Sequence, residues 1–536
     1  MLKKIKNKIE SSTKYQLFIN LFCQIFLVVT NMAISFFLVP FILKKLGADA
    51  YGFVGLANDF ISYAQIVTIA LNSMASRFIT INLCQKKYDT ANKMFNSVLI
   101  GNIIIGLALA IPMMLVIIFL PNIVTVPSAI LHSVRILWII LFINFIITII
   151  TSVFGVSTYA TNKLYLSYLR QIEGQAVRSI ILIITFVFLP TRLWYVGLAT
   201  LFATLIVSLY NYKYVKKFLP EIEFNKKYFD KKSIFTLIGS GIWNTVTKLG
   251  GLLSSGLDLL LTNTFINSTL MGILSVSKTL PNVILSFFGN LTSVFSPQLT
   301  ISYAKGDYEG IKEQLIFSMK LVGIFACIPI SIMIGLGMDF YNLWIPTADS
   351  NLLWWLSVVS GIGMVLSMPL EPLWNIFSTT NKVKQSSIFL IASSFANIII
   401  VLILLNIFDS DYVRLFVIAG TSTIISLVKS LTFLPMYGAK CVNLKWNTFY
   451  PTILKNTFST IIVTTLAFFI KKLLSINSWI MFIMNSIIVV IIALVINVFI
   501  VLNKEDRKKI LSLIKEKLNK IKGNKVKEWL KKLKSL

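Results

Sequence analysis

The chain consists of long apolar stretches separated by short gaps that hold most of its charged residues. A hydrocarbon core of about 30 Å is crossed by roughly 20 helical residues, and many of these stretches reach that length. Only 13% of the residues are charged, compared with roughly 25% in soluble domains. This leaves too little polar surface to cover a water-facing globule. The sequence therefore predicts an all-α membrane protein.

Apolar windows bounded by charged and turn residues predict about fourteen transmembrane helices. Twelve of them lie near 17–43, 53–83, 95–120, 134–159, 172–190, 195–215, 235–264, 271–302, 315–340, 352–378, 386–408 and 412–434. Two more lie near 452–474 and 478–502. The predicted domains are an N-terminal six-helix bundle (1–215), a basic linker (216–234), a C-terminal six-helix bundle (235–434), two extra helices (452–502) and a basic amphipathic tail (503–536).

The formal net charge of +29 comes mainly from bases in the gaps and in the tail. Gaps on one side of the predicted membrane hold many lysines, such as Lys86, Lys87, Lys226 and Lys227, and gaps on the other side hold few. The positive-inside rule places the lysine-rich side in the cytoplasm. With an even number of spans, both termini then lie on the cytoplasmic side of the membrane. Bases dispersed in this way argue against a nucleic-acid partner.

The tail contains apolar residues at helical spacing among many lysines. This pattern predicts either an amphipathic helix on the anionic inner leaflet or a solvated helix that only obeys the charge rule.

The two predicted bundles share a weak internal repeat with an offset of 220 residues. Matching residues are Ser73, Ser76, Thr80, Ile81 and Tyr88 with Ser293, Ser296, Thr300, Ile301 and Tyr308, Asp89 with Glu309, and Gly52 with Gly272. Six spans per half give both copies the same orientation. We therefore expect two like-oriented bundles related by an axis along the membrane normal, with substrate bound between them.

Several absences argue against an enzyme. His132 is the only histidine, and the four cysteines have no paired spacing, so neither a metal site nor a Ser-His-Asp triad can be assembled. No phosphate-binding GxxxxGK[ST] motif occurs. The outer gaps are too short for the catalytic domain that a membrane-embedded polymerase or ligase would need. We expect no catalysis, no cofactor and no metal.

Two segments carry a resemblance to a known family. The first predicted span ends in Leu46-Gly47-Ala48-Asp49-Ala50-Tyr51-Gly52, and the second closes with Ser76-Arg77-Phe78-Ile79. This is similar to the LGxxxYG … R pattern of bacterial polysaccharide-repeat (Wzx-type) flippases of the multidrug/oligosaccharidyl-lipid/polysaccharide (MOP) exporter superfamily. The motif is confined to about the first 90 residues, whereas the span count and layout agree over the whole chain.

The resemblance implies a MATE-like fold, with two six-helix bundles around a central cavity that opens alternately to each side. It also implies a substrate, an oligosaccharide on polyprenyl pyrophosphate, and partners such as a polysaccharide polymerase and glycosyltransferases. The two additional helices depart from the basic twelve-helix pattern and resemble lipid-II flippases, which form one alternative. An ion-coupled multidrug exporter of the same superfamily is the other.

Ionisable residues inside predicted spans are the candidate site residues, because a charge in hydrocarbon costs about 2.5–3.5 kcal/mol without a partner or water. Lys248, Arg178, Arg77 and Lys278 are predicted to bind an anionic headgroup, since arginine and lysine bind phosphate as a fork or a point charge. Lys248 is the strongest candidate, because no acidic residue lies three or four positions away. Arg77 is also close enough to the inner interface to snorkel.

Three acidic residues have a second interpretation. Asp258 with Lys278, and Glu173 with Arg178, could neutralise each other and hold helices together, or serve in coupling. Asp59 is the acid that an ion-coupled exporter would use in the first two spans, although its position in the outer third weakens that hypothesis.

Overall fold

The computed structural model describes residues 13–292, 295, 299, 302–303, 306–380 and 382–507. Within these ranges the regular elements are helices, and no β-strand occurs. Thirteen helical segments of the described chain are long and apolar enough to cross a membrane. The predicted all-α membrane protein is therefore confirmed. The tail from 508 onward and four repeat positions (Ser293, Ser296, Thr300 and Ile301) lie outside the described residues.

Contacts divide the chain into two compact units, each built from two segments. The first unit comprises Met1–Thr279 and Val383–Ser422, and the second comprises Leu280–Lys382 and Thr423–Leu536. These bounds do not coincide with the bounds predicted at 215 and 235. The difference arises because α11 (Lys231–Ser255) and α13 (Ser268–Ser277) pack against α3 (Ala48–Asn72), which is the second helix of the chain's described part.

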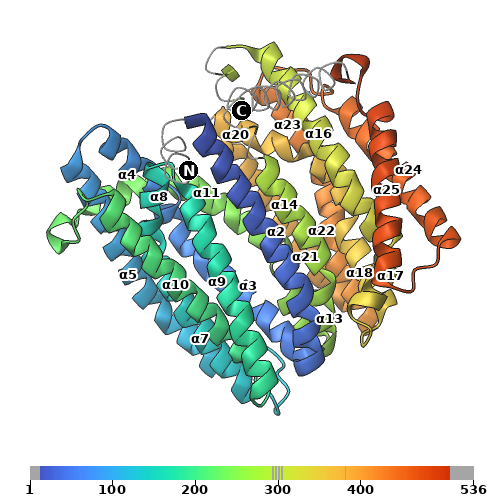
Figure 1. Ribbon diagram of the computed structural model, residues 1–536, viewed down its shortest axis with the longest axis horizontal. Helices are drawn as coiled ribbons and strands as arrows, with labels where there is room; N and C mark the ends of the chain where they lie inside the picture. The colour runs from blue at the N-terminus through green and yellow to red at the C-terminus, as the bar shows by residue number, and fades with distance from the viewer. Residues whose placement is uncertain are drawn as a thin grey trace, which may run out of the picture. The chain divides into compact units, whose positions relative to one another are not determined.

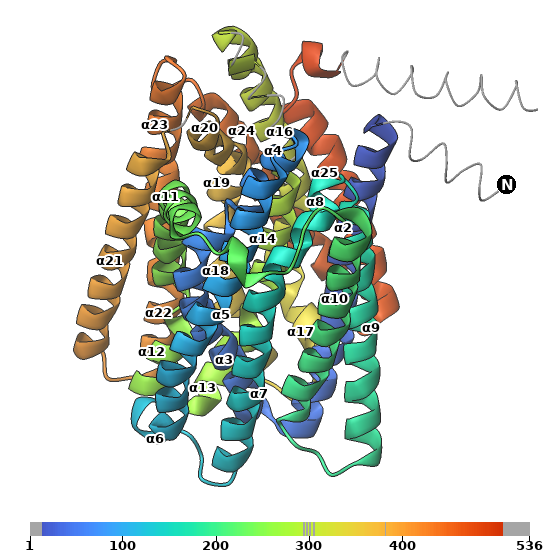
Figure 2. The same ribbon diagram turned by 90° about the vertical axis from the view of Figure 1, so that its left-hand side faces the viewer.

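The first unit contains most of the chain's N-terminal helices (Figures 1 and 2). Besides α3, α11 and α13 they are α2 (Thr13–Leu46), α4 (Ala75–Cys84), α5 (Tyr88–Ile118), α6 (Leu120–Ile123), α7 (Leu131–Thr151), the 3₁₀ turn η1 (Ser152–Gly155), α8 (Val156–Ala160), α9 (Leu164–Phe188), α10 (Tyr195–Phe218), η2 (Lys226–Tyr228), α12 (Asp258–Phe265) and α21 (Val383–Ile407). Helix α9 packs against both α2 and α10, and α10 packs against α7.

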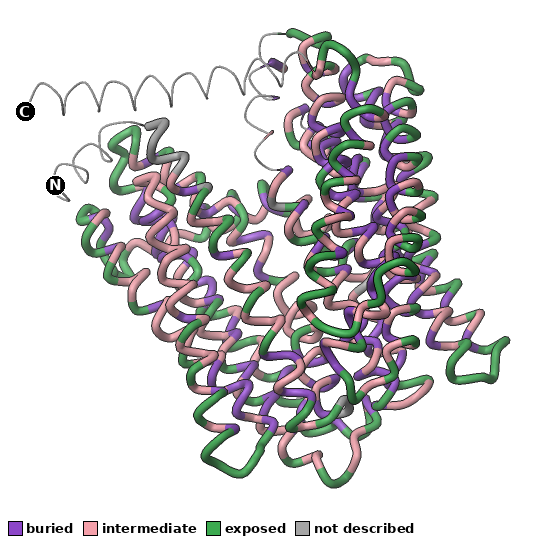
Figure 3. Tube along the Cα trace, turned by 45° about the vertical axis from the view of Figure 1, so that its right-hand side comes forward, coloured by how far each residue is buried: buried purple, intermediate pink, exposed green. Residues whose placement is uncertain are grey.

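The second unit holds the C-terminal helices. They are most of α14 (Thr279–Thr292), α16 (Tyr308–Gly335), α17 (Gly337–Trp344), α18 (Ser350–Gly361), α19 (Met364–Ser367), η4 (Met368–Leu373), α20 (Trp374–Thr379), the end of α22 (Asp411–Leu431), α23 (Phe433–Cys441), α24 (Tyr450–Leu473) and α25 (Trp479–Ile500). The two predicted extra helices are α24 and α25, and they pack with α16. Figure 3 shows exposed residues along the helices as well as at their ends, as expected where apolar side chains contact lipid.

Ion pairs in the second unit neutralise charged side chains that would otherwise be buried without a partner. The ammonium of Lys320 on α16, only 6% exposed, lies 2.6 Å from the Asp506 carboxylate. This bond holds the segment that follows α25 against α16. Lys471 on α24 pairs in the same way with Asp339 on α17, at 2.8 Å.

A polar network joins three helices in the core of the first unit. The side-chain amides of Asn72 and Asn102 donate to each other's oxygens, both at 2.9 Å. Asn102 also donates to the Ile149 carbonyl oxygen and to the Ser152 hydroxyl, and that hydroxyl donates to Asn72. Amides buried in a membrane protein need such partners, so this network fixes how α3, α5 and η1 meet.

The predicted seventh span is not one continuous helix. Helix α11 ends at Ser255, and α12 starts at Asp258 after an interruption at Gly256 and Leu257. In Figure 2 the first turns of α11 are viewed nearly along their axis, whereas α5 and α7 run up the picture. Four glycines and three lysines make α11 less apolar than the other spans. This explains why the described chain has thirteen candidate spans rather than the predicted fourteen.

The predicted basic linker is folded against α5. The amides of Asn92 and Asn96 donate to the carbonyl oxygens of Glu221 and Glu223 at 2.8 and 2.7 Å. Asp230 then caps α11 by accepting from the backbone N–H of Ser233. The Ser233 hydroxyl also donates to this carboxylate, which lowers the pKa of Asp230.

The helix bounds support the internal repeat. Helices α5 and α16 start 220 residues apart, at Tyr88 and Tyr308. The fourth span of each half is interrupted by a 3₁₀ turn, η1 in one and η4 in the other. The matching acidic residues Asp89 and Glu309 also make equivalent ion pairs, each with a lysine on its own helix at 2.6 Å.

The polar network predicts a measurable contribution to stability. Asn102→Leu would leave the Asn72 amide and the Ile149 carbonyl without these bonds, and should lower the free energy of unfolding by about 1–3 kcal/mol. Thermal unfolding of the purified protein in detergent measures this. The control is Asn406→Leu, since the exposed Asn406 bonds only to the Leu402 carbonyl of its own helix. Equal midpoints of thermal unfolding for the two variants would contradict a stabilising role of the polar network.

Candidate functional site

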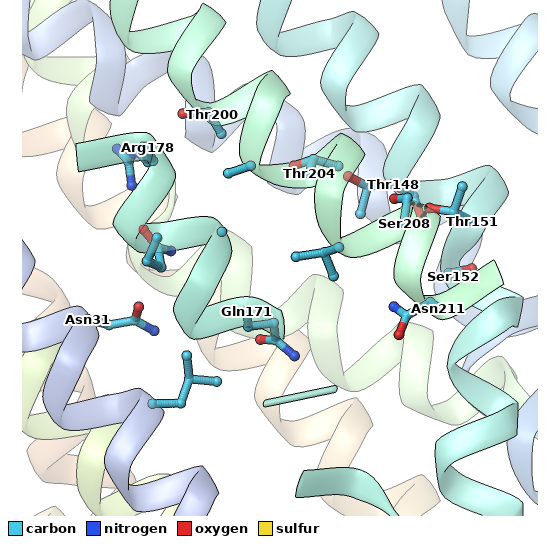
Figure 4. A pocket seen from close by; sticks show the side chains of 15 residues that line it. Asn31, Thr148, Thr151, Ser152, Gln171, Arg178, Thr200, Thr204, Ser208 and Asn211 are labelled. Atoms are coloured by element: carbon cyan, nitrogen blue, oxygen red, sulfur yellow. Dashed lines mark hydrogen bonds between the residues drawn. The ribbon is translucent and has the colours of Figure 1, made fainter. Parts of the chain in front are cut away.

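A polar cavity of about 350 Å³ lies among α2, α7, α9 and α10 of the first unit. Figure 4 shows its labelled side chains reaching it from these helices and from η1. The lining consists of Leu27, Asn31, Thr148, Thr151, Ser152, Gln171, Gly174, Gln175, Arg178, Thr200, Ala203, Thr204, Val207, Ser208 and Asn211. Most of these side chains carry a hydroxyl or an amide. Among the described residues, neither a carboxylate nor an aromatic ring lines it.

Helix α9 supplies one polar stripe of the cavity. Gln171, Gln175 and Arg178 are spaced by four and three residues, so they lie on one helix face. Gly174 lies between them, and a Cβ added there would meet Val207 and the backbone of Ala203 at 3.2 and 3.3 Å. Helices α9 and α10 therefore approach closely at this point, and the longer side chains extend into the space beyond.

Three of these lining residues each hold a buried polar atom without a hydrogen-bond partner within the described residues. The atoms are Nε of Arg178 and the amide oxygens of Asn31 and Asn211. Buried polar groups in proteins are almost always satisfied by protein, water or ligand. A cation surrounded by hydroxyl and amide side chains gives the cavity the polarity that a polar ligand requires. Arg178, which was predicted to bind the headgroup, lines this cavity, and its role in binding stays a prediction.

A second polar cavity of about 320 Å³ adjoins the first. It lies between α3 and α7, and Thr148 and Ser152 line both cavities. Its other lining residues include Gln65, Thr68 and Asn72. Asn72 belongs to the polar network, which therefore also forms a wall of this space.

Lys248 lies on the α3-facing side of α11. Gly241 and Asn244, seven and four residues earlier, contact α3 through Ala70 and Ser73, and these spacings place Lys248 on the same helix face. Its side chain is exposed and has no ion pair within the described residues. It does not line either cavity. Its role in headgroup binding stays a prediction.

The predicted pair of Glu173 and Arg178 is not formed. Glu173 instead accepts from Arg170, with 2.5 Å between Nη1 and Oε2. A spacing of five residues places Glu173 and Arg178 on different faces of α9, whereas a spacing of three places Arg170 beside Glu173. Arg77 is exposed on α4 and lines neither cavity.

The predicted pair of Asp258 and Lys278 is confirmed. The Lys278 ammonium donates to the Asp258 carboxylate, whose residue is only 4% exposed. Asp59 on α3 lies within electrostatic reach of both. The nearby Tyr63 hydroxyl donates to the carbonyl oxygen of Gly256, where α11 is interrupted. These residues form a cluster separate from the cavity lining.

Sequence reasoning missed the neutral part of the cavity. Gln171 and Gln175 with Arg178 form a polar stripe at helical spacing in an otherwise apolar span, and this signal was available. The contribution of α10 was harder to find. Its polar lining residues are Thr200, Thr204 and Ser208, and threonine and serine are common in transmembrane helices as intrahelical hydrogen-bond donors.

The fold resembles that of MATE family transporters. An inward-facing structure of a multidrug resistance MATE family transporter of the MOP superfamily matches with a TM-score of 0.66, covering 78% of this chain and 94% of that chain at 13% identity. An outward-facing structure from the same class matches with a TM-score of 0.56, covering 80% and 95%. A MOP superfamily transporter from Pyrococcus furiosus matches at 0.58, covering 80% and 94%.

The chain belongs to the polysaccharide biosynthesis protein family, whose model matches residues 18–302, slightly more than half of it. A curated relative, the uncharacterized membrane protein EpsK of Bacillus subtilis, is 26% identical over 493 residues, or 92% of this chain and 96% of that protein. The resemblance to Wzx-type flippases of the MOP superfamily is therefore confirmed. The protein is a multi-pass membrane protein of a family of flippases and exporters.

The cavity is predicted to be wet. In a variant whose natural cysteines are replaced, Thr204→Cys should react with a charged, water-soluble methanethiosulfonate, because the thiolate that reacts forms only in contact with water. The matched control is Phe202→Cys, two residues away on α10, whose side chain is 49% exposed on the surface of the unit. When membranes are labelled and the protein is analysed by mass spectrometry, the Thr204→Cys variant should be modified and the Phe202→Cys variant should not. Equal labelling would contradict an aqueous cavity.

Proposed function

We propose that the protein translocates an oligosaccharide linked to polyprenyl pyrophosphate across a bacterial plasma membrane, for assembly of a cell-surface polysaccharide. Transport proceeds by alternating access from the inner to the outer leaflet, without catalysis, and both termini lie in the cytoplasm. The observation that carries this proposal is the polar cavity lined by Arg178 and by hydroxyl and amide side chains. Family membership supplies the biosynthetic context.

The cavity lining suits this headgroup. A guanidinium donates to phosphate oxygens through a charge-assisted hydrogen bond. Hydroxyl and amide side chains both donate to and accept from sugar hydroxyls, and ten of the lining residues carry one of these groups. The lipid chain stays in the bilayer, so the protein has to shelter only the polar head. Transient partners would be the enzymes that build and polymerise the repeat unit.

A multidrug exporter is the alternative within the superfamily, and the lining argues against it. Binding sites for drug-sized apolar molecules are lined predominantly by hydrophobic and aromatic side chains. This cavity has neither an aromatic ring nor a carboxylate for a cationic drug. A lipid-II-type substrate shares the pyrophosphate and differs in the sugar, so its pyrophosphate would bind the same cation, Arg178.

Arg178→Gln provides the main test. It keeps the polarity and removes the cation, so the charge-assisted bond of about 1.5–3 kcal/mol is lost. We expect surface polysaccharide to fall about tenfold or more, while lipid-linked repeat units accumulate inside and the protein remains in the membrane at its normal level. Extraction and mass spectrometry of the lipid fraction measure the accumulation.

The matched control is Arg192→Gln, since Arg192 is an exposed cation between α9 and α10 that does not line the cavity. It should leave the polysaccharide unchanged. Normal export in the Arg178 variant would remove the cavity from the transport path. A loss of drug resistance without a change in polysaccharide would favour the exporter.

Lys248→Ala tests the prediction that rests on sequence alone. If this cation meets the headgroup on the α3-facing side of α11, export should stall and lipid-linked repeat units should accumulate, with the protein still inserted. Lys384→Ala is the control, because Lys384 is a nearby exposed cation that lies over the Trp243 ring, 5.6 Å from its centroid. Normal surface polysaccharide in the Lys248 variant would exclude it from the mechanism.

A further inference from the structure

Two aromatic rings near the end of α10 are each contacted by two cations. The guanidinium carbon of Arg170, on α9, lies 4.4 Å from the centroid of the Tyr210 ring, and the Lys213 ammonium lies 5.5 Å from the same centroid. Both distances are within the range of about 6 Å over which a ring attracts a cation. Among the described residues, Arg170 has an acidic partner in Glu173, whereas Lys213 has none.

The second ring belongs to Phe218, at the end of α10. The ammonium of Lys163, which directly precedes α9, lies 4.5 Å from its centroid, and the ammonium of Lys217 lies 5.9 Å from it. Neither lysine forms an ion pair within the part of the chain that the structure describes. As at the first ring, one cation comes from the α9 side and the other from α10. Together the two rings and their cations form the ring cluster: Lys163, Arg170, Tyr210, Lys213, Lys217 and Phe218.

The ring cluster holds more positive charge than its acidic partner Glu173 neutralises. Attraction to the rings keeps the cations in place, but it does not remove the repulsion between like charges that gather in a small volume. An anion bound among them lowers this energy. Arginine and lysine bind phosphate, as a fork and as a point charge. The cluster therefore has the chemistry of a phosphate-binding surface.

The face of α10 that leads to the ring cluster is apolar and exposed. Phe202 and Leu209 are 49% and 60% exposed, and Lys213 follows on the same helix face, because the spacings are seven and four residues. The helix rises about 16 Å from Phe202 to Lys213, close to half of a hydrocarbon core of about 30 Å. An acyl chain of one leaflet therefore fits between the middle of the membrane and the cluster.

We propose that the ring cluster binds the phosphate of an anionic phospholipid whose acyl chains lie along this exposed face of α10. The candidate span formed by α10 ends at Phe218, which places the cluster at the membrane surface, where headgroups lie. Helices α9 and α10 run side by side (Figures 1 and 2). Basic pockets between transmembrane helices bind the headgroups of anionic lipids.

The orientation of the chain decides which leaflet supplies the lipid. With a cytoplasmic N-terminus, α9 begins and α10 ends on the inner side, so the phospholipid belongs to the inner leaflet. This choice of leaflet rests on the orientation given with the proposed function, whereas the binding itself does not.

The bound lipid would join two helices next to the polar cavity. Arg170 and Tyr210 are each followed directly by a residue that lines this cavity, Gln171 on α9 and Asn211 on α10. A phosphate bonded to cations on the α9 side and on α10 ties these helices together there. Since a ligand that binds only the folded state stabilises it, anionic lipid should stabilise the protein more than neutral lipid does.

The double variant Lys163→Gln/Lys217→Gln tests the site, because it removes both charges at the Phe218 ring and keeps the side chains polar. The purified protein is titrated with phosphatidylglycerol, which is anionic, and with phosphatidylcholine, and bound lipid is measured by native mass spectrometry. Each lysine near the membrane surface strengthens the attraction to anionic lipid. We therefore expect the dissociation constant of the first phosphatidylglycerol to rise about tenfold or more, with phosphatidylcholine binding unchanged.

The matched control is Lys226→Gln/Lys227→Gln, which removes the same charge from exposed lysines of the linker. Within the described residues neither of these ammonium groups lies over a ring. The control should bind phosphatidylglycerol as the natural protein does. Equal weakening in the two double variants would reduce the effect to general charge attraction and overturn the proposal.

Thermal unfolding in nanodiscs shows that the variants are folded and measures the stabilisation. In phosphatidylcholine the natural protein and both double variants should share one midpoint. In phosphatidylglycerol the midpoint should rise for the natural protein and the control, and by less than half as much for the ring-cluster variant. Lys213→Gln removes one exposed charge of the cluster and should give an intermediate rise. Equal gains in all four proteins would contradict a lipid bound at the cluster.

Competition identifies the occupant. Inorganic phosphate and glycerol 3-phosphate lack acyl chains and should not displace bound phosphatidylglycerol at millimolar concentration. Displacement by either would make the cluster a site for free phosphate, and complete displacement by equimolar polyprenyl pyrophosphate would assign it to the transported lipid. Each of these results would overturn the proposal. Binding is measured on the purified protein, so this result is independent of whether the protein translocates a glycolipid.

Discussion

The structure depends on one constraint, namely that polar groups within the hydrocarbon find their partners inside the protein. The backbone meets this requirement by forming helices throughout the described spans. Side chains meet it in networks and pairs, as Asn72 with Asn102 and Lys320 with Asp506 illustrate. Against this background, one cavity of the first unit is lined by Arg178 and by hydroxyl and amide side chains. A polar lining of this kind within a membrane protein is suited to water or a polar ligand, which is the physical reason for placing the substrate here.

The same constraint explains what could be predicted from sequence. Hydropathy located the helices of the described chain, because each span must be apolar enough for lipid regardless of its neighbours. It also predicted α24 and α25 as additional helices. It predicted one apolar window near 235–264 for the seventh span, which the structure divides into α11 and α12 at Gly256 and Leu257.

Site residues were predictable where chemistry is local and not where it depends on tertiary contacts. Arg178 was predicted as a site residue because an ionisable side chain within a span needs a partner or water. Its assumed partner was wrong, since helical spacing pairs Glu173 with Arg170 instead. The cavity itself combines residues of α2, α7, α9 and α10, and no pattern within one segment indicates which helices converge. The internal repeat, in contrast, was visible in sequence and reappears as direct contacts at Gly52 and Gly272.

These contacts have a consequence for how the two halves could diverge. In an assembly of two identical chains, a residue on the twofold axis faces itself, so any change there occurs on both sides at once. Two glycines tolerate this doubling, and a pair of larger residues would force the helices apart. Joining the halves in one chain removes the restriction, because each side can then change alone. Serine opposite Gly55 is such a one-sided change, and so is Lys278 at the position that matches Asn58. The single chain thus acquired an unequal charge beside its own axis, which a symmetric pair of subunits could not have placed there.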